Sequence, residues 1–189
     1  MRKYYCLFTL PAILILLPSC SHTLPITDRP CKQNITVLSD NNTGNISVIS
    51  GTVTLIENDK DNDPSLSMYL QESGNKYMLS FIYSSFRNSP RPDKAILEFA
   101  DSSVMELGNP VYNKEMKEGS SNKYTDTFFE LNEKQLETLS DKAIMKIGIT
   151  FIITDQTHPL LTMPDAEKAA TIKYLANCFV ERTSEVNNK

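Results

Sequence analysis

The sequence predicts a β-rich α+β fold, in which a curved antiparallel sheet or a sandwich carries a short helix and a C-terminal helix packed on it. Three observations predict it. Before residue 132, short runs alternate apolar and polar residues, the period of strands with one buried face. A first helical signal appears only at Asn132, and a second follows Pro164. Strands first and helices late argue against alternating βαβ units.

The first strands are expected between residues 34 and 56. β-favourable residues occupy 35–37 and 46–48, and the Asn- and Gly-containing stretch 41–44 between them indicates a turn. Gly51 interrupts the pattern and indicates a bulge, after which apolar residues resume at 53–56.

A β-hairpin is expected next. Apolar residues alternate along 66–70 and again along 77–83, and Gly74 and Asn75 lie between the two runs. A short Gly-containing connection of this kind is typical of antiparallel hairpins.

The middle of the chain predicts three further strands. The stretch 89–92, with Pro90 and Pro92, is expected to break the pattern. Residues 95–99 then form a strand, and 104–107 pair back on it across a turn at 101–103. Residues 109–123 are polar and are expected to form a loop, and residues 124–131 are expected to form another strand. Later in the chain, His158 and Pro159 are also expected to lie in a loop.

Two helices and one long strand complete the fold. Asn132 and Gln135 form a capping pair for a short helix, and apolar residues then fill every second position from Ala143 to Ile153. Because its second face is also partly apolar, this strand is expected to be central. The last helix begins after Pro164, with one apolar face at three- and four-residue spacing made by Ala169, Ile172, Ala176 and Phe179.

The N-terminus has the pattern of a secretory signal. Arg2 and Lys3 precede an apolar run at residues 10–17, and the small residue Ser19 follows it. The run is shorter than the roughly 20 residues that a membrane-spanning helix needs. We therefore expect residues 1–19 to be removed as a signal peptide.

The four residues Leu17-Pro18-Ser19-Cys20 resemble the lipobox of bacterial lipoproteins. The resemblance implies that the Cys20 thiol receives a lipid such as palmitate and that the peptide before it is cleaved. Because Ser21 replaces the aspartate that retains members of this family at the inner membrane, the outer membrane is the favoured location. The rest of the chain resembles small periplasmic and outer-membrane lipoproteins loosely, without an implied activity. The alternative is ordinary secretion with a free Cys20.

The length of the chain predicts the number of domains, and its net charge indicates which partners it can bind. Removal of the signal leaves 170 of the 189 residues, which suits one domain. The net charge becomes −6 instead of −4, because Arg2 and Lys3 leave with the signal. Such an acidic chain is not expected to bind nucleic acid. We divide it into signal (1–19), lipid anchor and extended tether (20–33), a single β-rich globular domain (34–183) and a disordered tail (184–189).

The cysteines predict a disulfide. Of the four cysteines, Cys6 leaves with the signal and Cys20 carries the lipid, so Cys31 and Cys178 remain in a compartment that permits oxidation. Two buried unpaired thiols are the alternative. A cysteine nucleophile is disfavoured because the chain has only two histidines, His22 and His158.

An acidic loop is the one weak candidate for a metal site. Asp59, Asp61 and Asp63 have the spacing of the first three ligands of a calcium loop. The pattern then fails, because Pro64 stands where a glycine is needed and Leu70 where a bidentate glutamate is needed. We therefore expect a solvated loop and no cofactor.

No catalytic or nucleotide-binding motif is present in the sequence. The favoured function is a non-catalytic envelope lipoprotein that binds or scaffolds, with the membrane and an envelope protein as partners. The alternatives are a carrier of small apolar ligands, which needs a large cavity, and a small hydrolase with a spatially assembled carboxylate pair. The tyrosines are expected to fill core edges and sheet faces rather than to stack a sugar; they include Tyr69, Tyr77, Tyr83 and Tyr112.

Overall fold

The computed structural model describes residues 25–40, 45–57, 65–85, 91–118, 122–153 and 156–187. It confirms a β-rich α+β fold with two antiparallel sheets, a short helix and a C-terminal helix. The helices are η1 (Ile26–Asp28, a 3-10 turn), α1 (Cys31–Asn34), α2 (Glu133–Asp141) and α3 (Ala166–Asn187). The strands are β1 (Ile35–Ser39), β2 (Ile46–Ser50), β3 (Val53–Ile56), β4 (Ser65–Ser73), β5 (Lys76–Ser85), β6 (Arg91–Phe99), β7 (Val104–Gly108), β8 (Tyr112–Glu118), β9 (Asn122–Leu131), β10 (Ile144–Ile153) and β11 (Gln156–Thr162).

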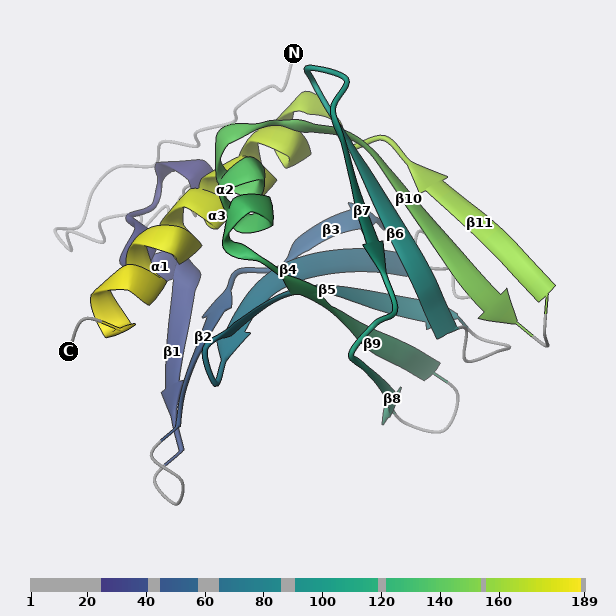
Figure 1. The fold of residues 1–189 in the computed structure, drawn as a ribbon, viewed down its shortest axis with the longest axis horizontal. Helices are drawn as coiled ribbons and strands as arrows, with labels where there is room; N and C mark the ends of the chain where they lie inside the picture. The colour runs from purple at the N-terminus through teal and green to yellow at the C-terminus, as the bar shows by residue number, and fades with distance from the viewer. Residues whose placement is uncertain are drawn as a thin grey trace, which may run out of the picture.

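The larger sheet has the order β1-β2-β4-β5-β9-β8, with β3 also paired to β4, and the smaller sheet has the order β11-β10-β6-β7. Figure 1 shows the smaller sheet crossing over the larger one, with α2 and α3 side by side at one end. All strand pairs are antiparallel. Pairs that are consecutive in the chain, such as β4–β5 and β6–β7, have connections too short for the crossover that parallel strands need.

The core lies where the inner faces of both sheets meet α3. Alternate residues of each inner strand point into it, as the period-two pattern predicts. The largest fully buried side chains come from both sheets and both longer helices; they are Phe81, Phe99, Phe129, Phe179, Leu66, Leu79, Leu97, Leu139, Ile144, Ile147, Ile149 and Val48.

The predicted hairpin is confirmed as β4 and β5. Gly74 and Asn75 connect the strands with φ angles of 60° and 61°. Two successive left-handed residues form the turn whose twist matches that of the strands it joins. Asn75 tolerates this conformation better than most residues do, and Gly74 does so without a steric cost.

The two longer helices begin where the sequence predicts. Asn132 Oδ1 accepts a hydrogen bond from the Gln135 backbone N–H at 2.9 Å, and Gln135 Oε1 accepts one from the Asn132 N–H at 2.9 Å. This reciprocal capping satisfies two donors that a helix start leaves free. At α3, the Asp165 carboxylate accepts a hydrogen bond from the Lys168 N–H at 2.8 Å.

Strand β10 is an interior strand of the smaller sheet, as predicted, with β11 on one side and β6 on the other. The alternation predicted Met145 on its buried face, which is wrong: Met145 is 53% exposed. A register shift between Ile144 and Lys146 adds a residue to the strand at this point. Such a bulge reverses the facing of the residues that precede it.

Three stretches expected to lack strand structure contain strands. β8 lies within 109–123, β11 contains His158 and Pro159, and β6 begins at Arg91 and includes Pro92. β8 and β11 are sheet edges, where polar residues and proline are tolerated because one side of the backbone needs no partner in the sheet. Pro92 pairs only with β10, since β7 reaches β6 from Lys94 onward.

The bulge expected at Gly51 matches a one-residue shift in register. Gly51 lies between β2 and β3, which both pair with β4; Ile49 stands opposite Gln71 and Val53 opposite Met68, so the segment around Gly51 has one residue more than β4. A second shift lies between Thr54 and Ile56. The ends of the domain differ from expectation. Residues 25–33 contain η1 and most of α1 instead of an extended tether, and α3 continues to Asn187 through most of the expected tail.

We predict that Gly74→Ala lowers the free energy of unfolding by about 1–2 kcal/mol, because alanine pays the steric cost of the left-handed conformation. Gly108→Ala is the matched control: nothing lies within 4 Å of the added Cβ at either glycine, and only Gly74 has a positive φ. Urea denaturation measures both variants. Equal urea midpoints for Gly74→Ala and Gly108→Ala would contradict the left-handed conformation of Gly74 in the turn.

Candidate functional site

The first described residues are fastened to the C-terminal helix by a disulfide. Cys31 in α1 and Cys178 in α3 are bonded, with their Cα atoms 4.9 Å apart although 147 residues separate them in sequence. Cys178 is fully buried on the face of α3 that packs on the core. The structure therefore pairs the two cysteines that the sequence leaves for oxidation.

Hydrogen bonds reinforce this attachment. The Tyr174 hydroxyl donates to the Arg29 carbonyl, and the buried Asn34 side chain donates to the Ile26 carbonyl at 3.1 Å and to the Arg29 carbonyl at 3.4 Å. The Gly51 N–H donates in turn to the Asn34 carbonyl at 2.7 Å. Residues 26–34 are thus held by bonds to α3, by a bond to the loop before β3 and by hydrogen bonds within the segment. We call this arrangement the N-terminal clamp.

A second polar arrangement lies on the outer face of the larger sheet. The Tyr69 hydroxyl donates to Asp126 Oδ2 at 2.7 Å, and the Ser80 hydroxyl donates to Asp126 Oδ1. Asp126 is 6% exposed and Ser80 is fully buried. The three side chains come from β4, β5 and β9, which are neighbours in the sheet. Both carboxylate oxygens therefore accept hydrogen bonds from hydroxyl groups.

The environment keeps the Tyr69 phenol protonated. Burial raises the pKa of the Tyr69 hydroxyl above its ordinary value; the hydrogen bond with Ser80 opposes this shift and Asp126 reinforces it. The Tyr69 ring packs edge-on against Phe128, with ring centres 6.3 Å apart. At neutral pH the cluster is a satisfied hydrogen-bond network in which the phenol is a donor and not a base.

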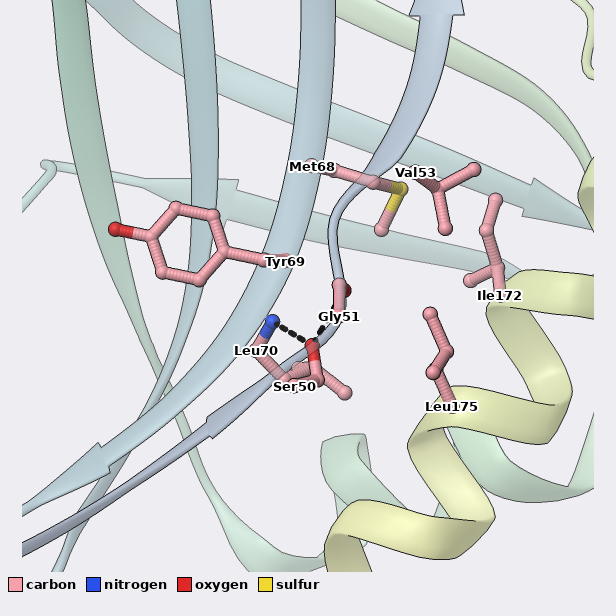
Figure 2. Close-up of a pocket in the computed structure, with 8 residues that line it drawn as sticks. All are labelled: Ser50, Gly51, Val53, Met68, Tyr69, Leu70, Ile172 and Leu175. Carbon is pink, nitrogen blue, oxygen red and sulfur yellow. Dashed lines mark hydrogen bonds between the residues drawn. The ribbon is translucent and has the colours of Figure 1, made fainter. Parts of the chain in front are cut away.

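The cavity between α3 and the larger sheet is small. Its wall combines Val53, Met68 and Leu70 from the strands with Ile172 and Leu175 from α3 (Figure 2). Its volume is about 10 Å³, near the minimum that a single water needs and far below the several hundred Å³ of ligand pockets. The Leu70 N–H and the Gly51 carbonyl both bond to the Ser50 hydroxyl beside it. This cavity is a packing gap, and it gives the carrier alternative no support.

Larger grooves lie at the surface; one, of about 550 Å³, is lined by Asn75, Tyr77 and residues 131–134. A groove of about 290 Å³ between β7 and α2 includes Lys142, whose ammonium contacts Asp101 at 2.6 Å and Ser103 at 3.0 Å. Lys142 and Ser103 hold the pKa of the Asp101 carboxyl below its usual range. Another groove, of about 480 Å³, has an acidic rim that includes Asp165 and Glu167.

The other predicted site residues fall in several places. Cys20 and the calcium candidates Asp59, Asp61 and Asp63 lie outside the described residues. Within the described part of the chain, no three His, Cys, Asp or Glu side chains are grouped to hold a metal ion. His158 is exposed on the edge strand β11.

The ring of Tyr77 contacts Phe179 and the ring of Tyr83 contacts Phe151, both buried phenylalanines. This agrees with the expectation that the tyrosines fill the edges of the core. The Tyr112 side chain lies outside the described part. No motif in the sequence marks Ser80 and Asp126 as partners of Tyr69. The signal that links them to Tyr69 is the register of β4, β5 and β9, which pairs Tyr69 with Ser80 and places Asp126 beside them.

No protein-family model, curated protein or solved structure matches this chain. Over the described residues, no helix has both the length and the apolar character to cross a membrane.

We predict that mass spectrometry of alkylated, non-reduced protein finds a linked Cys31–Cys178 peptide. Replacing both residues by alanine should lower the free energy of unfolding by up to roughly 5 kcal/mol, the chain-entropy value for so long a loop. Limited proteolysis should then cut first near residues 26–34. Two alkylated thiols in the unmodified protein would contradict the bond.

We predict that Tyr69→Phe costs about 1–3 kcal/mol at neutral pH, because it leaves a buried acceptor of Asp126 unpaired. The unfolded phenol loses its proton near pH 10, whereas the folded one keeps it to higher pH. The stability that Tyr69 contributes is therefore complete below about pH 10 and is lost as the pH rises further.

The difference in the free energy of unfolding between wild type and Tyr69→Phe should consequently become smaller above about pH 10. Tyr77→Phe is the matched control, since the ring of Tyr77 also packs on a phenylalanine but its hydroxyl has no described hydrogen bond. Urea denaturation of wild type and both variants at several pH values measures these differences. A stability difference between wild type and Tyr69→Phe that stays constant with pH would exclude Tyr69 as the titrating group.

Proposed function

We propose that this chain is a membrane-anchored lipoprotein of the cell envelope with a non-catalytic binding or scaffolding role. The disulfide between Cys31 and Cys178 is the observation that carries the proposal. Such bonds persist in oxidising compartments, which an exported chain enters and a cytosolic chain does not. The signal pattern and the lipobox-like residues ending at Cys20 point to the same route.

The N-terminal clamp suits a domain that is held by its N-terminus. A lipid on Cys20 would apply any pull from the membrane at residue 25. The disulfide and the Tyr174 hydrogen bond would pass that pull to α3, which packs along the core, and not to the edge strand β1. This connection supports a role in which the folded domain is presented as a rigid body.

The outer face of the smaller sheet supports a role in binding. Ile152 and Val104 are 40% and 55% exposed there, and Lys94–Glu106 and Lys146–Glu98 pairs cross neighbouring strands beside them. Apolar residues bordered by charges are typical of protein contact surfaces. We therefore propose an envelope protein as the partner of the domain, with the outer membrane as the favoured location.

We predict that Cys20→Ser moves the protein from the detergent-extracted membrane fraction to the soluble fraction, because it removes the only proposed lipid attachment. Cys6→Ser is the matched control: it changes a cysteine that leaves with the signal and should not alter partitioning. Labelling with radioactive palmitate should likewise be lost only in Cys20→Ser. Unchanged partitioning of Cys20→Ser would refute lipidation, and a soluble wild type would favour ordinary secretion.

A further inference from the structure

Two exposed apolar side chains lie where the smaller sheet leads into α3. Leu161 is 56% exposed, and Met163 is 73% exposed, the largest fraction among the exposed large apolar residues of the described part. Leu161 stands opposite Gly148 on β10, which has no side chain to cover it. The next residue after Met163, Pro164, is buried and fixes the chain before α3 begins. We call Leu161 and Met163 the apolar tip.

The apolar tip lies near the point where the chain enters the described structure. Ile26 lines the same groove as Asp165 and Lys168 at the start of α3. Met163 is two residues from Asp165, so their Cα atoms are at most about 7 Å apart. Figure 1 shows the start of α3 and the purple first residues on the same, upper side of the molecule.

The tether between the anchor and the fold is short. Only four residues separate Cys20 from Pro25, and five Cα–Cα steps extend to about 18 Å at most. Because the N-terminal clamp holds residues 26–34 on α3, the folded domain cannot move further from a lipidated Cys20. The end of the domain that carries the apolar tip must therefore stay close to the bilayer.

We propose that the apolar tip contacts the lipid surface and orients the domain on it, an inference that rests on the proposed lipidation of Cys20. Methionine and leucine side chains suit the boundary between headgroups and acyl chains. Asp165, Glu167 and Glu57 border the adjacent groove, with Lys168 as its basic residue. This excess of negative charge is repelled by anionic lipid, so the surface contacted is a zwitterionic one.

Leu38, near the far end of β1 (Figure 1), serves as the comparison for the apolar tip. Leu38 is 51% exposed near the end of β1, and Figure 1 shows β1 running away from α3 toward the bottom of the view. A domain oriented by the apolar tip holds Leu38 away from the lipid. A domain that tumbles freely on its tether exposes both ends equally.

The chain has no tryptophan, so one introduced tryptophan reports on one position. We would couple the chain from Cys20 onward, which keeps every described residue, to maleimide lipid through Cys20, the only thiol outside the disulfide. The vesicles contain phosphatidylcholine with brominated acyl chains, which quench nearby tryptophan. Met163→Trp is the test variant and Leu38→Trp is the control.

The fluorescence of the Met163→Trp variant should fall roughly twofold in brominated relative to ordinary phosphatidylcholine, because the introduced side chain lies at the acyl boundary. The fluorescence of the Leu38→Trp variant should not change. Replacing about a third of the lipid by phosphatidylglycerol should weaken the quenching of Met163→Trp by charge repulsion. Equal quenching of the two variants, or no quenching of Met163→Trp, would overturn the proposed contact; stronger quenching with phosphatidylglycerol would overturn the zwitterionic assignment.

Because the anchor is attached chemically in this experiment, these outcomes do not depend on lipidation in the cell, which Cys20→Ser tests separately. A linked Cys31–Cys178 peptide in each variant shows that the clamp is intact. A third variant, which combines Met163→Ser with Leu161→Trp, should be quenched less than Leu161→Trp alone; equal quenching would remove Met163 from the contact.

Discussion

The disulfide between Cys31 and Cys178 is the constraint on which the ends of this fold depend. Without it, the described contacts that attach residues 26–34 to α3 and the core would be the hydrogen bond from Tyr174 to Arg29 and the packing of Ile26. The disulfide joins the first described residues covalently to α3, the last helix of the chain. Helix α3 is itself held by its buried face, so the attachment reaches the core and not only the surface.

This arrangement connects the fold to the proposed anchoring. A lipid on Cys20, as proposed, would place the membrane at one end of the domain and would leave most of both sheets to face other molecules. The outer face of the larger sheet is stiffened by Asp126, which links Tyr69 and Ser80 across three strands. Because these groups bond to one another, the cluster stabilises the pairing of β4, β5 and β9.

Residues whose behaviour depends on near neighbours in sequence were predicted well. The reciprocal cap of Asn132 and Gln135, the Gly74-Asn75 turn and the buried alternation along β10 all follow from local rules of capping, twist and period. The failures have specific causes. β8 and β11 are polar or proline-containing edge strands, whose backbone pairs on one side and whose composition resembles a loop. Met145 was misassigned because one inserted residue reverses the alternation. The cluster around Asp126 depends on register between strands that are distant in sequence.

The sequence by itself determined the class of fold, the start of both longer helices and the two cysteines left for pairing, because these depend on side-chain type and on short spacings. Tertiary structure alone decided that residues 26–34 pack on α3, that Asp126 meets Tyr69 and Ser80, and that Ile26 shares a groove with the start of α3. Each of these needs two segments far apart in sequence to meet, and that meeting follows from how the sheets and α3 share one core.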